Sequence, residues 1–159
     1  MKYFWINGNI NDELFKSLLT FFNENEECAK TVYITGDGGD MIVGEAIIDL
    51  LSVEKPLLVA HGQLHSATLR IFVLAKTSKQ VLPCTCGFHH LTFINITLND
   101  LGKPRSHYDK AQIEDEMLDY NSRINDINKI IKFTKEEKKR LNNNEDVYIS
   151  TERLRKCQN

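Results

Sequence analysis

A serine, a histidine and a pair of glycines stand at positions from which proteins commonly act on a substrate. Gly38 and Gly39 follow a predicted strand and precede a predicted helix, so their backbone N–H groups can face a ligand oxygen without a side chain in the way. Ser66 starts a helix after another strand, near the positive end of that helix's dipole. His90 lies on a later strand. These residue types are those of nucleophilic catalysis by serine and histidine.

Each of these features also has a simpler structural interpretation. A glycine pair usually makes a turn, a serine at a helix start usually caps it, and a histidine in a strand is usually a core group. A serine and histidine site also requires a carboxylate that orients the histidine. Asp146, just ahead of a short predicted strand, is one candidate. Asp100 and Asp109 are rivals in a polar stretch that is typical of an exposed loop.

Two cysteines close to two histidines raise the question of a metal site. Cys84 and Cys86 are separated by one residue, whereas a zinc knuckle usually has two residues between its cysteines. In extended chain, alternation places Cys84, Cys86 and His90 on one face and His89 on the other. We therefore expect no metal site and interpret the cysteines as small buried apolar groups.

The length and composition favour one globular domain. The 159 residues are 42% hydrophobic, enough for one core and short for two. Twenty basic side chains against 22 acidic ones leave a net charge of -2, which disfavours nucleic acid as a partner. No apolar run is long enough to span a bilayer, and the apolar start is too short for a secretory signal, so we expect a cytoplasmic protein without membrane partners.

Short apolar runs alternate with segments of helical period, which predicts βα units and a mostly parallel sheet. The predicted strands are 3–6, 31–35, 57–60, 80–82 and 88–96. Asn11 is expected to cap a helix with Leu14, Leu18 and Phe22 on one face. A turn over 36–40 precedes a helix with Ile42, Ala46, Ile47, Leu50 and Leu51 at core spacing, and a further helix covers 67–75.

The second half of the chain has a different pattern. Residues 108–133 carry a heptad seam on a long predicted helix, formed by Ile113, Met117, Tyr120, Ile124, Ile127 and Ile131. The seam packs either on a second subunit or back on its own sheet, and we expect a homo-oligomer. Thr134 begins a capping box with Glu137, residues 146–149 are extended, and Ser150 caps a last helix.

The order of these features resembles the caseinolytic protease proteolytic subunit, ClpP, of the ClpP/crotonase superfamily. Residues 33–39 resemble the family's strand and Ser-Pro-Gly-Gly turn, and residues 44–49 resemble the helix after it. Residues 62–66 resemble its Gly-x-Ala-Ala-Ser segment, which carries the nucleophile. Residues 82–90 resemble the family's histidine strand, and residues 144–150 resemble its aspartate segment. The distance from Pro83 selects His90 over His89.

The resemblance implies an α/β fold of repeated ββα and βα units with a long protruding handle helix. It divides a single domain, 1–159, into a head of about 1–107 and 134–159 and a handle of about 108–133. It implies a cofactor-free serine endopeptidase in stacked rings that cleaves unfolded protein or peptides, with Ser66 as nucleophile, His90 as base and Asp146 as its orienting carboxylate. The backbone N–H groups of Gly39 and Ala67 would form the oxyanion hole.

Departures from the family pattern define the alternatives. The family's axial loop and early helix, which meet an ATP-driven AAA+ unfoldase, have no counterpart before Tyr3, and this weakens the expectation of that partner. Leu64 and His65 replace small residues before the serine, and Asp37 replaces the proline of the glycine turn. His65 and Asp37 favour an inactive or regulatory ring subunit. A crotonase-like acyl-thioester enzyme would not need the three site residues. A serine-lysine peptidase would use Lys76 or Lys79.

Overall fold

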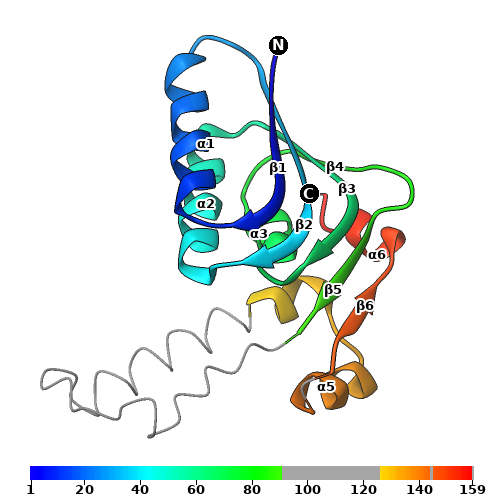
Figure 1. Cartoon of the computed structure of the whole chain (residues 1–159). Helices are drawn as coiled ribbons and strands as arrows, with labels where there is room; N and C mark the ends of the chain where they lie inside the picture. Colours follow the sequence, from blue (N-terminus) through cyan, green and yellow to red (C-terminus); the bar gives the residue numbers. More distant parts are fainter. Residues whose placement is uncertain (91–125, 144, 159) are drawn as a thin grey trace, which may run out of the picture.

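A mostly parallel sheet forms the centre of the residues that the computed structural model describes, which are 1–90, 126–143 and 145–158 (Figure 1). Its strands are ordered β1 (Lys2–Ile10), β2 (Lys30–Gly39), β3 (Leu57–His65), β5 (Cys86–His89) and β6 (Val147–Ile149), and β4 (Lys79–Val81) pairs with β3. The pairs are parallel except that β6 runs antiparallel to β5. The predicted α/β class with a mostly parallel sheet is therefore confirmed.

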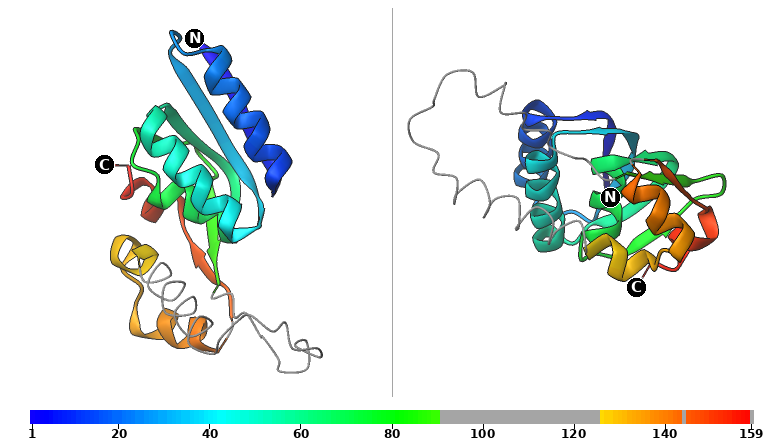
Figure 2. Two further views of the ribbon diagram at one scale, coloured as in Figure 1. Left: turned by 90° about the vertical axis from the view of Figure 1, so that its left-hand side faces the viewer. Right: turned by 90° about the horizontal axis from the view of Figure 1, so that it is seen from below.

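Three helices are crossover connections between parallel strands, α1 (Asp12–Glu24), α2 (Met41–Glu54) and α3 (Ser66–Leu74). Helix α5 (Lys135–Asn142) precedes β6, α6 (Thr151–Arg155) follows it, and a further helical stretch covers 126–131. Figures 1 and 2 show α1 and α2 side by side along one face of the sheet. Within the described residues, no helix is both long enough and apolar enough to cross a membrane.

The three predicted helix caps are confirmed. The Asn11 side chain accepts a hydrogen bond from the Leu14 N–H, and the Ser150 hydroxyl accepts one from the Arg153 N–H. Thr134 and Glu137 form the full capping box, in which each side chain binds the other's backbone N–H. These caps satisfy N–H groups that the first helical turn leaves without partners.

The sheet has one covered face and one face with exposed aromatic rings. Ile6 and Ile34 are fully buried and pack in one cluster with Leu18 of α1. Because side chains alternate along a strand, Trp5 lies on the opposite face, where it is 54% exposed and stacks on Tyr33 at a ring distance of 4.4 Å.

The stretch 36–40, predicted as a turn, instead continues the strand to Gly39. It keeps pairing because β1 and β3 extend beside it, with Gly38 opposite Asn9, Gly39 opposite Ile10 and Gly36 opposite Leu64. The pairing is irregular, and the register shifts in both ladders. A Cβ atom on Gly36 would lie 2.6 Å from the Gly8 carbonyl oxygen, so the close approach of the two strands requires glycine there.

Two expectations about core positions are wrong. Ile42 is 83% exposed, because the register of α2 turns Val43 and Ile48 inward beside Ile47, which is buried as predicted. Ile127 and Ile131 are buried in the core of their own chain, so this end of the heptad seam does not face a second subunit. Ile113, Met117, Tyr120 and Ile124, together with residues 91–96 of the predicted fifth strand, lie outside the described residues.

The cysteines also differ from expectation. Cys84 is exposed, in the turn before β5 and with a φ of 63°, and Cys86 is half-buried. Alternation along β5 leaves Cys86 and Phe88 partly exposed and buries Gly87 and His89. The interpretation as buried thiols is therefore wrong for Cys84, because this residue lies in the turn before β5 and not within the strand.

Candidate active site

Ser66 stands at the sharp junction between β3 and α3. Its backbone is in the left-handed region, with a φ of +47°, which a residue other than glycine adopts only when the surrounding structure imposes it. The junction places the serine at the first position of α3, directly after the carboxyl end of a parallel strand. Functional groups of open α/β sheets gather at that end of the strands.

Gly38 packs directly against this junction. A Cβ atom at Gly38, where φ is +103°, would lie 2.8 Å from Ser66 Cβ and 3.2 Å from the Ala67 backbone nitrogen. Only glycine therefore lets the end of β2 come this close to the serine. The same approach brings Gly38 beside the Ala67 backbone nitrogen, one of the two predicted oxyanion donors. Gly39, the other predicted donor, is the next residue and packs against Asn9 and Ile10 of β1.

His90 and Asp146 are brought together by the β5–β6 ladder. The antiparallel register pairs Phe88 with Tyr148 and His89 with Val147, so the next pair along is His90 and Asp146. Their side chains meet, with His90 Nδ1 3.3 Å from Asp146 Oδ1. Asp100 and Asp109 lie outside the described residues.

The neighbouring ladder relates this pair to the serine. Strand β3 pairs with β5 in parallel, and His65 is the register partner of Phe88. Ser66 therefore follows the last paired residue of β3, and His90 follows β5 on the adjacent strand. The structure thus places Ser66, His90 and Asp146 at the ends of three neighbouring strands, with His90 and Asp146 in contact.

The two departures near the serine take specific positions. The His65 ring stacks on Phe88 at a centroid distance of 4.4 Å, and its Nε2 atom lies 3.3 Å from Gln63 Oε1. This stacking holds His65 against β5. Asp37 is exposed to solvent. The nearby Asp40 carboxylate caps α2 by accepting hydrogen bonds from the N–H groups of Ile42 and Val43.

His89, the neighbour of His90, lies on the buried side of β5. It is 2% exposed and stacks on Phe133 at 5.4 Å. Burial, followed by the nearby charges of His90 and Arg70, lowers the pKa of His89 to about 4. Its ring is therefore neutral at pH 7. Of the two imidazoles, the fold leaves His90 the more accessible, and His90 is also the one that the family resemblance selects.

The serine-lysine alternative lacks geometric support for Lys79. The Lys79 ammonium donates to the Val73 carbonyl oxygen at 2.8 Å, at the far end of α3 from Ser66. Val73 follows Ser66 by seven positions, which along a helix corresponds to a rise of about 10 Å. Burial lowers the pKa of Lys79 to about 8, with an opposing effect from Cys157. Lys79 therefore has an unusual environment, but it lies away from the serine.

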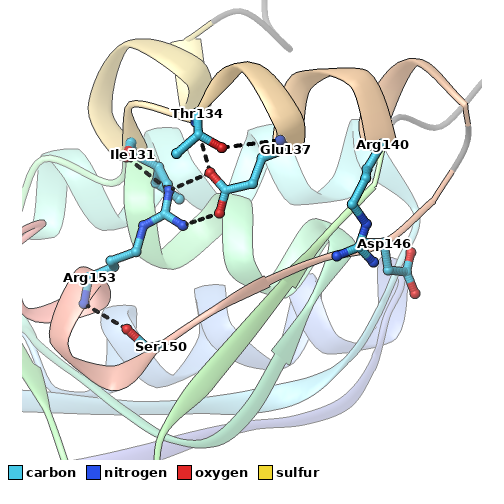
Figure 3. Close-up of polar contacts among 7 residues, drawn as sticks. All are labelled: Ile131, Thr134, Glu137, Arg140, Asp146, Ser150 and Arg153. Carbon is cyan, nitrogen blue, oxygen red and sulfur yellow. Dashed lines mark hydrogen bonds and ion pairs between the residues drawn. The ribbon is translucent and has the colours of Figure 1, made fainter.

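Two arginines near the site were not singled out by the sequence. Arg70 is 3% exposed and binds Glu45 at 2.5 Å, which joins α3 to α2 below the serine. Arg140 binds the Glu145 carboxylate and the Asp146 carbonyl. Figure 3 shows Arg140 beside Asp146. No local sequence pattern marks Arg70 or Arg140, because folding of the chain brings each arginine to its partners. In the described part of the chain, no three or more histidine, cysteine or acidic side chains gather as a metal site would require.

Comparison with known proteins gives a structural match. No protein-family model matches the sequence, and no curated protein matches it either. Among solved structures, a mutant of ClpP1 from Listeria monocytogenes superposes with a TM-score of 0.67. The match covers 98% of this chain and 86% of that one at 21% sequence identity. At this identity the likeness establishes architecture, and we conclude that the chain has a ClpP-like fold.

Proposed function

We propose that this protein is a serine endopeptidase in which Ser66, His90 and Asp146 form the catalytic triad. The contact between His90 Nδ1 and Asp146 Oδ1 at 3.3 Å is the observation that carries the proposal. It joins two residues that are far apart in sequence, and it does so at the strand end next to a serine held at positive φ. A carboxylate on Nδ1 is the arrangement that prepares an imidazole to act as a base through its other nitrogen.

The proposed mechanism follows from these positions. Asp146 accepts the Nδ1–H of His90 and so fixes the neutral tautomer in which Nε2 carries the lone pair. His90 Nε2 then takes the proton of Ser66 as its Oγ attacks the scissile carbonyl, and later delivers that proton to the leaving amine. The backbone N–H groups of Gly39 and Ala67 would stabilise the oxyanion, because backbone donors are already in place when the charge develops.

The triad is tested by removing its members singly and together. Ser66→Ala and His90→Ala should each abolish cleavage of short fluorogenic peptides, and the double variant should lose little more, since the residues act as one unit. A serine-directed phosphonate should label Ser66 in the wild type. Losses that multiply would contradict the triad. A wild type that neither cleaves peptides nor reacts with the phosphonate would favour the inactive ring subunit.

The orienting carboxylate has its own control. Asp146→Asn should reduce kcat by roughly 10⁴-fold, because an amide holds the wrong tautomer of His90. Asp126→Asn makes the same chemical change at an exposed carboxylate whose described contact is with Lys129, and it should leave turnover unchanged. Full activity in Asp146→Asn, with loss in Asp100→Asn or Asp109→Asn, would assign the role to another residue.

The proposal includes a homo-oligomer that acts in the cytoplasm on unfolded protein or short peptides. The ClpP-like fold and the remaining apolar residues of the heptad seam support self-association. Ile124→Asp is the informative variant, because Ile127 and Ile131 already pack in their own core. It should lower the mass measured by light scattering, and Ile130→Asp, at a helical position that is 43% exposed, is the control. A monomeric wild type would refute self-association.

A further inference from the structure

Arg140 closes the turn that delivers Asp146 to His90. Its carbonyl oxygen accepts from the backbone N–H groups of Asn143 and Glu145, both at 3.0 Å. Its guanidinium binds the Glu145 carboxylate through Nε at 3.2 Å, and it donates from Nη2 to the Asp146 carbonyl oxygen at 2.8 Å. One residue near the end of α5 therefore holds the chain on both sides of the position from which the Asp146 side chain projects.

The two ends of this turn are fixed by the core. Leu141, the residue after Arg140, is 2% exposed, and Val147, the residue after Asp146, is 1% exposed. Between these two anchors, Asn142, Asn143, Glu145 and Asp146 are exposed, and Asp146 precedes the first residue of β6. The β6 ladder fixes Val147, whereas the orientation of the Asp146 peptide group depends on the contact with Arg140.

The contact is made to the backbone of Asp146 and leaves its carboxylate for His90. Figure 3 shows the Arg140 guanidinium on one side of Asp146 and the carboxylate directed away from it. Holding the carbonyl on one side fixes the backbone dihedral angles that aim the side chain. The carboxylate is 59% exposed and His90 is 36% exposed, so little packing holds the pair in place.

We infer that Arg140 is a positioning residue that aims the Asp146 carboxylate at His90 Nδ1, an inference that rests on the proposed function. Arginine suits this task because its planar fork binds the Glu145 carboxylate and the Asp146 carbonyl at once. Lysine presents a single ammonium on a flexible stem and cannot hold both acceptors in a fixed geometry. Arg140 acts through Asp146 and contacts neither the serine nor the histidine in the described structure.

The test combines three variants at two positions. Arg140→Ala should lower kcat by between about tenfold and a hundredfold, with little change in KM, as a small misplacement of a catalytic group does. Arg140→Lys should retain part of the activity. In an Asp146→Asn background, Arg140→Ala should cost nothing further, because the group that it aims is already gone. Equal losses in both backgrounds would overturn the inference.

Lys139→Ala is the matched control. It removes the same charge from the same helical turn, at an exposed residue, and should leave turnover unchanged. Thermal melting of all variants should show that Arg140→Ala is folded, because the groups that it releases are solvent-exposed. An Arg140→Ala loss that Arg140→Lys does not reduce, or that Lys139→Ala reproduces, would contradict the assigned role.

A spectroscopic measurement separates this inference from the proposed function. The proton on His90 Nδ1 should give a downfield NMR resonance when a carboxylate binds it, assigned by its loss in His90→Ala and Asp146→Asn. The resonance should persist in Lys139→Ala and disappear in Arg140→Ala. If it persists in Arg140→Ala, the inference is wrong whatever the turnover. If it disappears in a protein that never cleaves peptides, Arg140 still positions Asp146, and only the proposed function fails.

Discussion

Acid should destabilise this protein through His89, the buried histidine beside the candidate base. The side chain is 2% exposed, and neither ring nitrogen has a hydrogen-bond partner among the described residues. Burial, then the charges of His90 and Arg70, lowers its pKa from 6.5 to about 4. The unfolded chain therefore takes up a proton below pH 6.5, whereas the folded chain resists protonation until about pH 4.

The sign and size of the effect follow from this interval. Stability from the neutral ring is fully present above pH 6.5 and is lost as the pH falls towards 4. Each pKa unit corresponds to about 1.4 kcal/mol, so His89 should remove about 3 kcal/mol of unfolding free energy over this range. With a urea slope of about 2 kcal/mol per molar, the midpoint should fall by about 1.5 M.

Two variants isolate this contribution from that of the acidic side chains. His89→Leu and His89→Gln both remove the titrating ring, and urea unfolding between pH 7 and 4 should show a shallower loss of stability in both. His89→Leu should also be at least as stable as wild type at pH 7. It removes two unpartnered buried nitrogens that cost about 1–3 kcal/mol, which offsets the lost stacking on Phe133 of about 0.5–1.5 kcal/mol. Parallel curves for wild type and both variants would refute the reasoning.

Three further substitutions test the fold around the site. Gly38→Ala should cost about 1–3 kcal/mol of stability, since its Cβ would meet Ser66 Cβ at 2.8 Å and its φ is +103°; unchanged thermal melting and turnover would contradict the close approach. Ile127→Ala should cost about 2–5 kcal/mol in urea unfolding, and a wild-type midpoint would mean that this residue does not pack in its own core. Thr134→Ala should lower stability by about 0.5–2 kcal/mol by removing the hydroxyl that caps α5, whereas Lys138→Ala on the same helix should not.

Local features of the fold could be predicted from the sequence because their partners are close along the chain. The caps at Asn11, Thr134 and Ser150 each depend on a hydrogen bond to a residue three positions on, and all three are present. The alternation of strand and helix follows in the same way from short-range periodicity. Residue types also restricted the candidate site to a serine, a histidine and a carboxylate, and the family resemblance selected one of each.

Tertiary structure decided which distant residues meet and which apolar residues face inward. Strand β2 extends through its glycines because two neighbouring strands continue beside it, and periodicity within β2 does not contain that information. Ile127 belongs to the core because the fold returns its helix to the sheet. The contact of His90 with Asp146 arises from the antiparallel register of β5 and β6, which pairs residues distant in sequence. Arg140 could not be found from the sequence, since its partners lie five and six residues away across the end of a helix, where the path of the chain depends on how Leu141 and Val147 are buried.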